Sequence, residues 1–220
     1  YITIASIKPF EKNLLLTCES IIEKLKADPE ADVYSYDESL HLLGRLNSAE
    51  GNKLLQKIVL LKQKNLNRII ITDLLLNKQT VPKEMIEFQA ADKEYRFSFY
   101  YRLQENGLTA FFPPKYSTQK SIAESDVYNM ASDEYEVEEI VYIREKVSEY
   151  DQEQKRFHLF KVKVEGSWHL GISGGYEMDS KIIHMKKGKD VGGIYWEEEF
   201  DMKKVNEQFE AYLKENVEEE

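Results

Sequence analysis

The sequence has a single cysteine, Cys18, no long run of apolar residues, and fewer basic than acidic side chains. One cysteine excludes an internal disulfide and a zinc site built on several cysteines. No stretch approaches the roughly 18–20 uninterrupted apolar residues of a membrane-spanning helix, so no membrane insertion is expected. A general nucleic-acid surface is not expected either. Phosphate contacts need clustered Lys and Arg, whereas this chain has 30 basic and 40 acidic residues.

The chain contains enough hydrophobic residues to form a core, since they make up 42% of its 220 residues. This length predicts one large domain or two small ones. Residues 131–220 hold 13 basic and 23 acidic side chains, which gives −10, so residues 1–130 hold 17 of each and are neutral. The acidic excess therefore belongs to the second part of the chain, where it is typical of a solvated face or of a surface for a basic partner.

Apolar residues at spacings of three and four predict a series of short helices before Met130. Cys18 lies in the first such stripe, within residues 11–27, and is interpreted as a core residue rather than a nucleophile. His41 lies beside the next stripe and is interpreted as a hydrogen-bonded residue at a helix edge. Tight turns between the helices predict an antiparallel helical array over 1–130, either degenerate helix-pair repeats or a plain bundle.

Residues 92–112 allow two interpretations. The segment 95–99 alternates like a strand, and Asn106-Gly107 is a hairpin signal. A helix through about Gln104 is favoured, because a helical stripe runs back from Leu103 to Met85 and Gly107 suits the end of a helix.

After Met130 the pattern changes to a small antiparallel sheet with one C-terminal helix packed on it, over 131–220, so the fold class is α+β. Residues 137–147 predict an edge strand. Strands 156–164 and 167–173 predict a hairpin around Glu165-Gly166, in which His158 faces Ser173 and His169 faces Val162. Residues 182–185 are expected to add a strand, and 186–189 and Gly192-Gly193 are expected to be loops.

Gly171-Ile172-Ser173-Gly174-Gly175 matches the G-x-S-x-G pattern of a nucleophile elbow, which gives a serine-dependent hydrolase using Ser173 and His158 as one alternative. The elbow needs a following helix, an acid and a distant histidine, and the sequence offers none of these convincingly. A glycine-rich turn explains the motif better. His158, His169 and His184 do not have the spacing of a zinc site, so no metal-binding residue is assigned. No catalytic residue and no cofactor-binding residue is assigned either.

Aromatic residues beside a run of glutamates form the candidate partner contact. The residues are Tyr195, Trp196, Glu197, Glu198 and Glu199. Exposed aromatic rings ringed by acid are typical of a protein-contact surface. The alternative is that these aromatics only cover the sheet under the last helix.

A further set of residues carries a resemblance to a family. It comprises Arg96, Tyr100, Leu103, Phe112-Pro113, Gln119, Ser125, Phe160-Lys161, Trp168 and Gly171. In this order, from Tyr36 to Leu213, the chain resembles the C-terminal end of large uncharacterised exported proteins of Bacteroidetes-type bacteria. The resemblance implies degenerate helical repeats followed by a small β-rich cap, a helix over 92–104 and an exported context. It implies no catalytic residue, and the chain departs from it at Gly174–Asp179, where a proline-containing turn is expected.

These observations favour a non-catalytic interaction or accessory segment of a larger protein, more readily than an enzyme. The expected partner is a protein of unknown identity, and the acidic excess favours a basic one. An exported location is favoured over a cytoplasmic one, and the start at Tyr1 indicates either a removed leader or a segment of a longer chain. The alternatives are the hydrolase and a structural cap that only closes the helical array.

Overall fold

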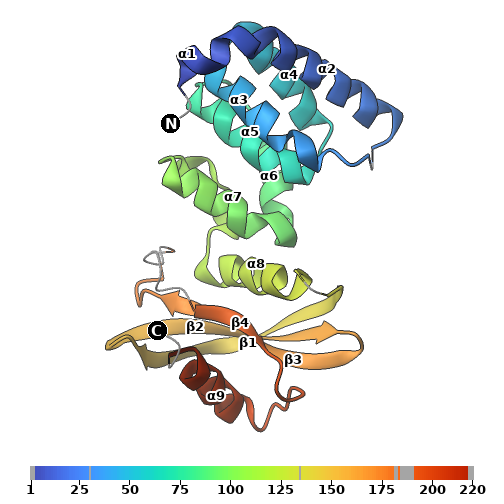
Figure 1. Ribbon diagram of the computed structural model, residues 1–220. Coiled ribbons are helices and arrows are strands. Elements are labelled where there is room, and N and C mark those ends of the chain that lie inside the picture. The colour runs from blue at the N-terminus through green and yellow to red at the C-terminus, as the bar shows by residue number, and fades with distance from the viewer. Residues whose placement is uncertain (1–2, 30, 134, 181–182, 184–190, 218–220) are drawn as a thin grey trace. The chain divides into compact units, whose positions relative to one another are not determined.

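Helices fill the first half of the chain and a four-stranded antiparallel sheet dominates the described residues of the second half, so the predicted α+β class is confirmed (Figure 1). The computed structural model describes residues 3–29, 31–133, 135–180, 183 and 191–217. The chain divides into two compact units, Tyr1–Pro113 and Pro114–Glu220. The division falls at the Pro113-Pro114 pair, which is earlier than the boundary after Met130 that the change in composition suggests.

The first unit is helical throughout its regular elements. They are α1 (Ile4–Ile7), α2 (Glu11–Ala27), α3 (Asp37–Leu46), α4 (Ala49–Leu60), α5 (Lys64–Leu76), α6 (Lys83–Ala91) and α7 (Lys93–Glu105), with 3₁₀ turns at Lys8–Phe10, Tyr34–Tyr36 and Thr109–Phe111. Helices α3, α5 and α7 contact one another in a row, and α2 and α4 form a second row beside α3 and α5. The helices thus form an array, while degenerate helix-pair repeats stay a prediction, because the pairs have no fixed period in sequence.

Helix α7 settles the ambiguity at residues 92–112 in favour of a helix. The predicted continuous stripe from Met85 to Leu103 is nevertheless broken at Asp92, whose carboxylate accepts hydrogen bonds from the backbone N–H groups of Glu94 and Tyr95 and so begins a new helix. The buried Arg96 donates from Nε to the carbonyl of Ala90 at 2.9 Å, which satisfies a terminal group of α6. Residues that compete for backbone groups therefore override the apolar periodicity here.

The second unit combines a helix, the sheet and a last helix. Its elements are the 3₁₀ turn Pro114–Tyr116, α8 (Gln119–Ser132), β1 (Val137–Tyr150), β2 (Glu153–Val164), β3 (Ser167–Tyr176), β4 (Val191–Tyr195) and α9 (Val205–Val217). The strand order is β1-β2-β3-β4, all antiparallel. The predicted hairpin register is confirmed, because His158 pairs with Ser173 and Val162 pairs with His169.

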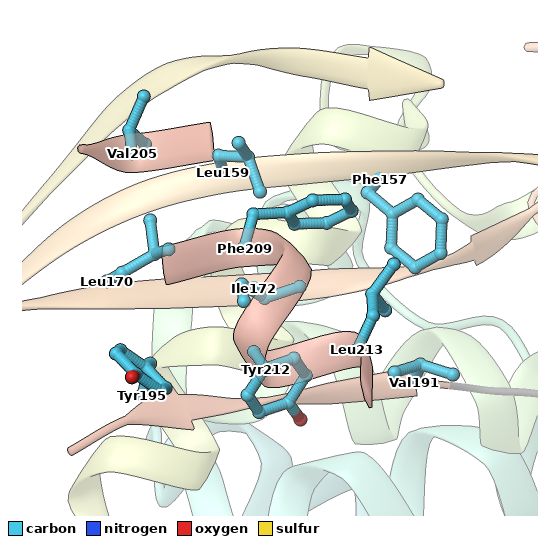
Figure 2. Packing of buried hydrophobic residues seen from close by; sticks show 10 residues of the cluster. All are labelled: Phe157, Leu159, Leu170, Ile172, Val191, Tyr195, Val205, Phe209, Tyr212 and Leu213. Carbon is cyan, nitrogen blue, oxygen red and sulfur yellow. The ribbon is translucent and has the colours of Figure 1, made fainter. Parts of the chain in front are cut away.

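Each face of this sheet is covered by one helix, not one face alone as predicted (Figure 1). On one face, Ala123, Val127 and Ala131 of α8 pack against residues that include Phe160 and Val162. On the other face, Phe209 and Leu213 of α9 pack against β2, β3 and β4, and the Phe157 and Phe209 rings meet edge to face at 5.2 Å (Figure 2). Helix α8 was assigned to the helical array by its chain position, whereas its apolar stripe is buried against the sheet.

Strand β4 corrects the prediction that Gly192-Gly193 is a loop. Both glycines lie in the strand, paired with Ser173 and Ile172 of β3. An added Cβ at Gly193 would lie 2.4 Å from the Tyr212 hydroxyl of α9, so the glycine permits close packing of the helix on the strand. The predicted strand at 182–185 and loop at 186–189 lie, apart from Ile183, outside the described residues.

The G-x-S-x-G motif lies within β3, so the prediction that it forms a glycine-rich turn is wrong. An added Cβ at Gly171 would lie 2.5 Å from Cγ1 of Val127, so this glycine lets α8 approach the sheet. Gly175 has φ +84° and lies opposite the point where the pairing with β2 shifts between Arg156 and His158. A bulge with a glycine in the left-handed region accounts for that position.

Candidate functional site

The predicted contact residues lie at the end of β4. Tyr195 is buried and belongs to the cluster under α9, as the alternative reading of these aromatics expected. Trp196, one residue further, is 41% exposed, and its ring lies 5.2 Å from that of Tyr135 and 4.7 Å from that of His169. The side chains of Glu197, Glu198 and Glu199 are exposed. The segment therefore divides into an internal tyrosine and an external tryptophan with its acidic neighbours.

Beside this segment, a cleft of about 490 Å³ lies between the end of α8, strand β4 and α9. Its lining consists of Met130, Asp133, Gly192, Gly193, Ile194, Tyr195, Trp196, Glu197, Tyr212 and Glu215. Three of the five predicted contact residues thus lie in one cleft, and Glu198 and Glu199 follow it in the chain. The volume lies within the range of small-ligand and side-chain pockets.

The charge of the cleft has one sign. Asp133, Glu197 and Glu215 are exposed on its rim, and none of the described lining residues is basic. Burial raises the pKa of the Tyr195 hydroxyl, and the negative charges of Glu198, Glu215 and Glu197 raise it further. A negative potential therefore extends over the aromatic part of the cleft.

Seven of the ten described residues that line the cleft were not predicted from the sequence as contact residues. Met130 and Asp133 precede the sheet, and Tyr212 and Glu215 belong to the closing helix, so they meet β4 only in the folded unit. Tyr212 of α9 is buried. The signals in the sequence that pointed to this region were the acidic excess of residues 131–220 and the aromatic residues beside Glu197–Glu199.

Ser173 and His158, the pair named for the hydrolase alternative, are cross-strand partners but do not form the required contact. Ser173 Oγ donates a hydrogen bond to Asp126 Oδ2 at 2.7 Å and lies 3.0 Å from the Tyr176 hydroxyl. Neither ring nitrogen of His158 has a hydrogen-bond partner among the described residues. A general base must reach the proton that it removes, and here that proton points to a carboxylate.

His158 is instead a buried aromatic residue of the core. Its ring lies 5.5 Å from that of Tyr176 and 6.0 Å from that of Tyr142. Burial lowers the pKa of His158 to about 4, and the positive charges of Arg156 and Lys120 lower it further. The imidazole is therefore neutral at neutral pH.

Of the remaining sequence candidates, Cys18 and His41 belong to the first unit. Cys18 is buried, and burial raises its pKa to about 12, so its thiol is not an activated nucleophile. His41 Nδ1 lies 2.8 Å from Oδ2 of the buried Asp73, which confirms a hydrogen-bonded histidine at a helix edge. His169 packs on Trp196, whereas His184 lies outside the described residues. No group of three or more His, Cys, Asp or Glu side chains in the described part of the chain could hold a metal ion.

The described part of the first unit also forms clefts, and two of them can be compared with the cleft beside β4. One, of about 450 Å³, lies between α2 and α4 and carries charges of both signs, Glu19 and Glu23 with Lys26 and Lys57. The other, of about 260 Å³, lies beside α4 and α5 and is mainly apolar. Neither combines aromatic rings with charge of one sign, so the cleft beside β4 has the more selective chemistry.

Among the described helices, none is both long and apolar enough to cross a membrane.

Comparison with known proteins adds no relative to this description. The chain matches no protein-family model, no curated protein and no solved structure.

Proposed function

We propose that the chain is a non-catalytic protein-interaction segment of a larger exported protein, and that its second unit binds a basic partner in the cleft beside β4. The observation that supports the proposal is the combination of Trp196 with the carboxylates of Asp133, Glu197 and Glu215 around one cleft that has no basic residue among its described lining. Export is part of the same proposal and rests on the family resemblance alone.

The chemistry of the cleft favours a cation over other ligands. A Lys or Arg side chain gains from the face of an exposed tryptophan and from carboxylates within a few ångströms. The net charge of −10 draws a basic partner from a distance and repels an acidic one, an effect that salt reduces. Exposed aromatic rings also supply most of the contact energy in many protein interfaces.

A peptide titration of the full chain tests the proposal. The probe is acetyl-(Lys-Val)5-amide, with acetyl-(Glu-Val)5-amide as the oppositely charged control, and the readout is the fluorescence of Trp196 and Trp168, the chain's two tryptophans. The basic peptide is expected to bind at least about tenfold more tightly than the acidic one, and more weakly as salt is raised.

A pair of charge-matched variants places the binding in the cleft. Glu197→Lys/Glu215→Lys and Glu139→Lys/Glu149→Lys both change the net charge from −10 to −6, but the second pair lies on β1, a different strand. The cleft variant is expected to weaken binding of the basic peptide about tenfold, and the β1 variant less than about threefold. Equal losses in both variants, or no binding of the basic peptide at all, would contradict the proposal.

A further inference from the structure

The two edges of the described sheet differ in how they are protected against further pairing. Strand β1 forms one edge and carries exposed charged residues, among them Glu139, Glu145 and Glu149. Its pairing with β2 is also shifted in two places, between Val137 and Glu139 and between Tyr142 and Arg144. Charges and bulges are the usual devices that keep an edge strand from accepting another strand.

Strand β4 has neither device. Its sequence Val191–Tyr195 contains no charged residue, and its pairing with β3 runs without a shift. In the described part of the chain β4 has a strand on one side only, and no backbone hydrogen bond to another segment joins its other side. Gly192 and Gly193 have no side chains that would cover their backbone groups, and both line the cleft.

We propose that the partner binds in an extended conformation and adds to the open edge of β4 as a fifth strand, with basic side chains directed at the carboxylates of the cleft. This inference rests on the proposed function and specifies how the basic partner is held. Backbone hydrogen bonds to β4 would supply affinity, and the cleft walls would select the side chains.

The walls of the cleft fit a strand in this place. Successive side chains of a strand point to opposite faces of the sheet. On one face an added strand meets Met130 and Asp133 at the end of α8, and on the other face it meets Tyr212 and Glu215 of α9. Each wall therefore pairs one apolar or aromatic side chain with one carboxylate. The five residues of β4 span about 17 Å, which matches a partner segment of about five residues.

Hydrogen exchange and backbone-methylated peptides test strand addition on the full chain. On saturation with acetyl-(Lys-Val)5-amide, amides of Gly192–Ile194 that face the open edge are expected to exchange at least about tenfold more slowly, while those of β1 do not change. N-methyl groups on two adjacent central residues of the peptide block both of its edges without changing its charge. They are expected to weaken binding at least about tenfold, whereas two on the terminal residues weaken it less than about threefold.

The outcomes separate this inference from the proposed function. If the centrally methylated peptide binds as well as the unmodified one and β4 is not protected, strand addition is wrong, while the proposed binding of a basic partner in the acidic cleft stands. Protection of β1 in place of β4 overturns the choice of edge. If no basic peptide binds in any form, both the function and the inference fail.

Discussion

His158 makes the stability of the second unit depend on pH. Its side chain is 3% exposed, its ring nitrogens have no hydrogen-bond partner among the described residues, and its pKa is lowered to about 4 from an ordinary 6.5. The unfolded chain therefore binds a proton at this site at a higher pH than the folded chain does. The stability is fully present above about pH 6.5 and is lost as the pH falls through that value to about 4.

Replacement of His158 by phenylalanine is expected to remove this dependence. Phenylalanine keeps an aromatic ring between Tyr142 and Tyr176 and has no nitrogen to protonate. From about pH 7.5 to about pH 4, the free energy of unfolding of the wild type should fall by about 3 kcal/mol more than that of His158→Phe.

Urea unfolding followed by tryptophan fluorescence measures this difference in the second unit alone, because Trp168 and Trp196 both lie there. The other titratable groups contribute equally to both proteins, so their effect cancels when the change in the free energy of unfolding with pH is compared between the two. If this free energy changed equally with pH in His158→Phe and in the wild type, His158 would not be the group that makes the stability depend on pH.

At the scale of elements, the contact of α8 with the sheet depends on residues that have little or no side chain. Gly171 faces Val127 so closely that a Cβ would lie 2.5 Å from Cγ1 of the valine and 2.8 Å from Cγ2 of Val162. Real Cβ atoms do not approach so closely, so a larger residue would force α8 outward or distort β3.

We expect Gly171→Ala to destabilise the second unit by about 1–3 kcal/mol, and Val127→Ala to offset part of that loss. In a double-mutant cycle the two changes should couple favourably by at least about 1 kcal/mol. The matched control is Val164→Ala, a buried valine of the same cluster that is not among the nearest atoms to Gly171. Tryptophan fluorescence in urea gives the free energies, and equal coupling for both valines would contradict this account.

The sequence predicted elements well where a local pattern and the tertiary context agree. Helix α7 and the hairpin register around Glu165-Gly166 follow from periodicity and turn residues and are confirmed. The break at Asp92 was missed because a capping carboxylate competes with an apolar stripe that continues across it. Strand β4 was missed because glycines weaken a strand locally, and because Tyr212, whose close packing requires Gly193, lies nineteen residues further along the chain. The cleft was found only in part for the same reason, since α8 and α9 supply its walls.

At the scale of the whole molecule, the division into two units and the packing of α8 against the sheet of the second unit determine which fragments can fold. Without α8, the face of the sheet that carries Phe160 and Val162 would be open to water. Exposure of a contiguous apolar face of this kind leads to aggregation.

We therefore expect residues 114–220 to give a soluble, folded product, and residues 131–220 to aggregate or remain unfolded. Circular dichroism and gel filtration of the two fragments measure this difference. Residues 1–113, which end at the division between the units, are expected to fold as a helical product. A folded monomer from residues 131–220 would show that α8 is dispensable for the sheet.

The open edge of β4 also has a consequence for the behaviour of the protein at high concentration. An uncharged edge strand can pair with the same strand of a second copy of the chain, and such pairing leads to self-association. Two β4 edges in contact would bring Asp133, Glu197 and Glu215 of both copies together, and their like charges oppose that approach. The acidic rim would thus repel a second copy of the chain and still allow a basic segment to bind.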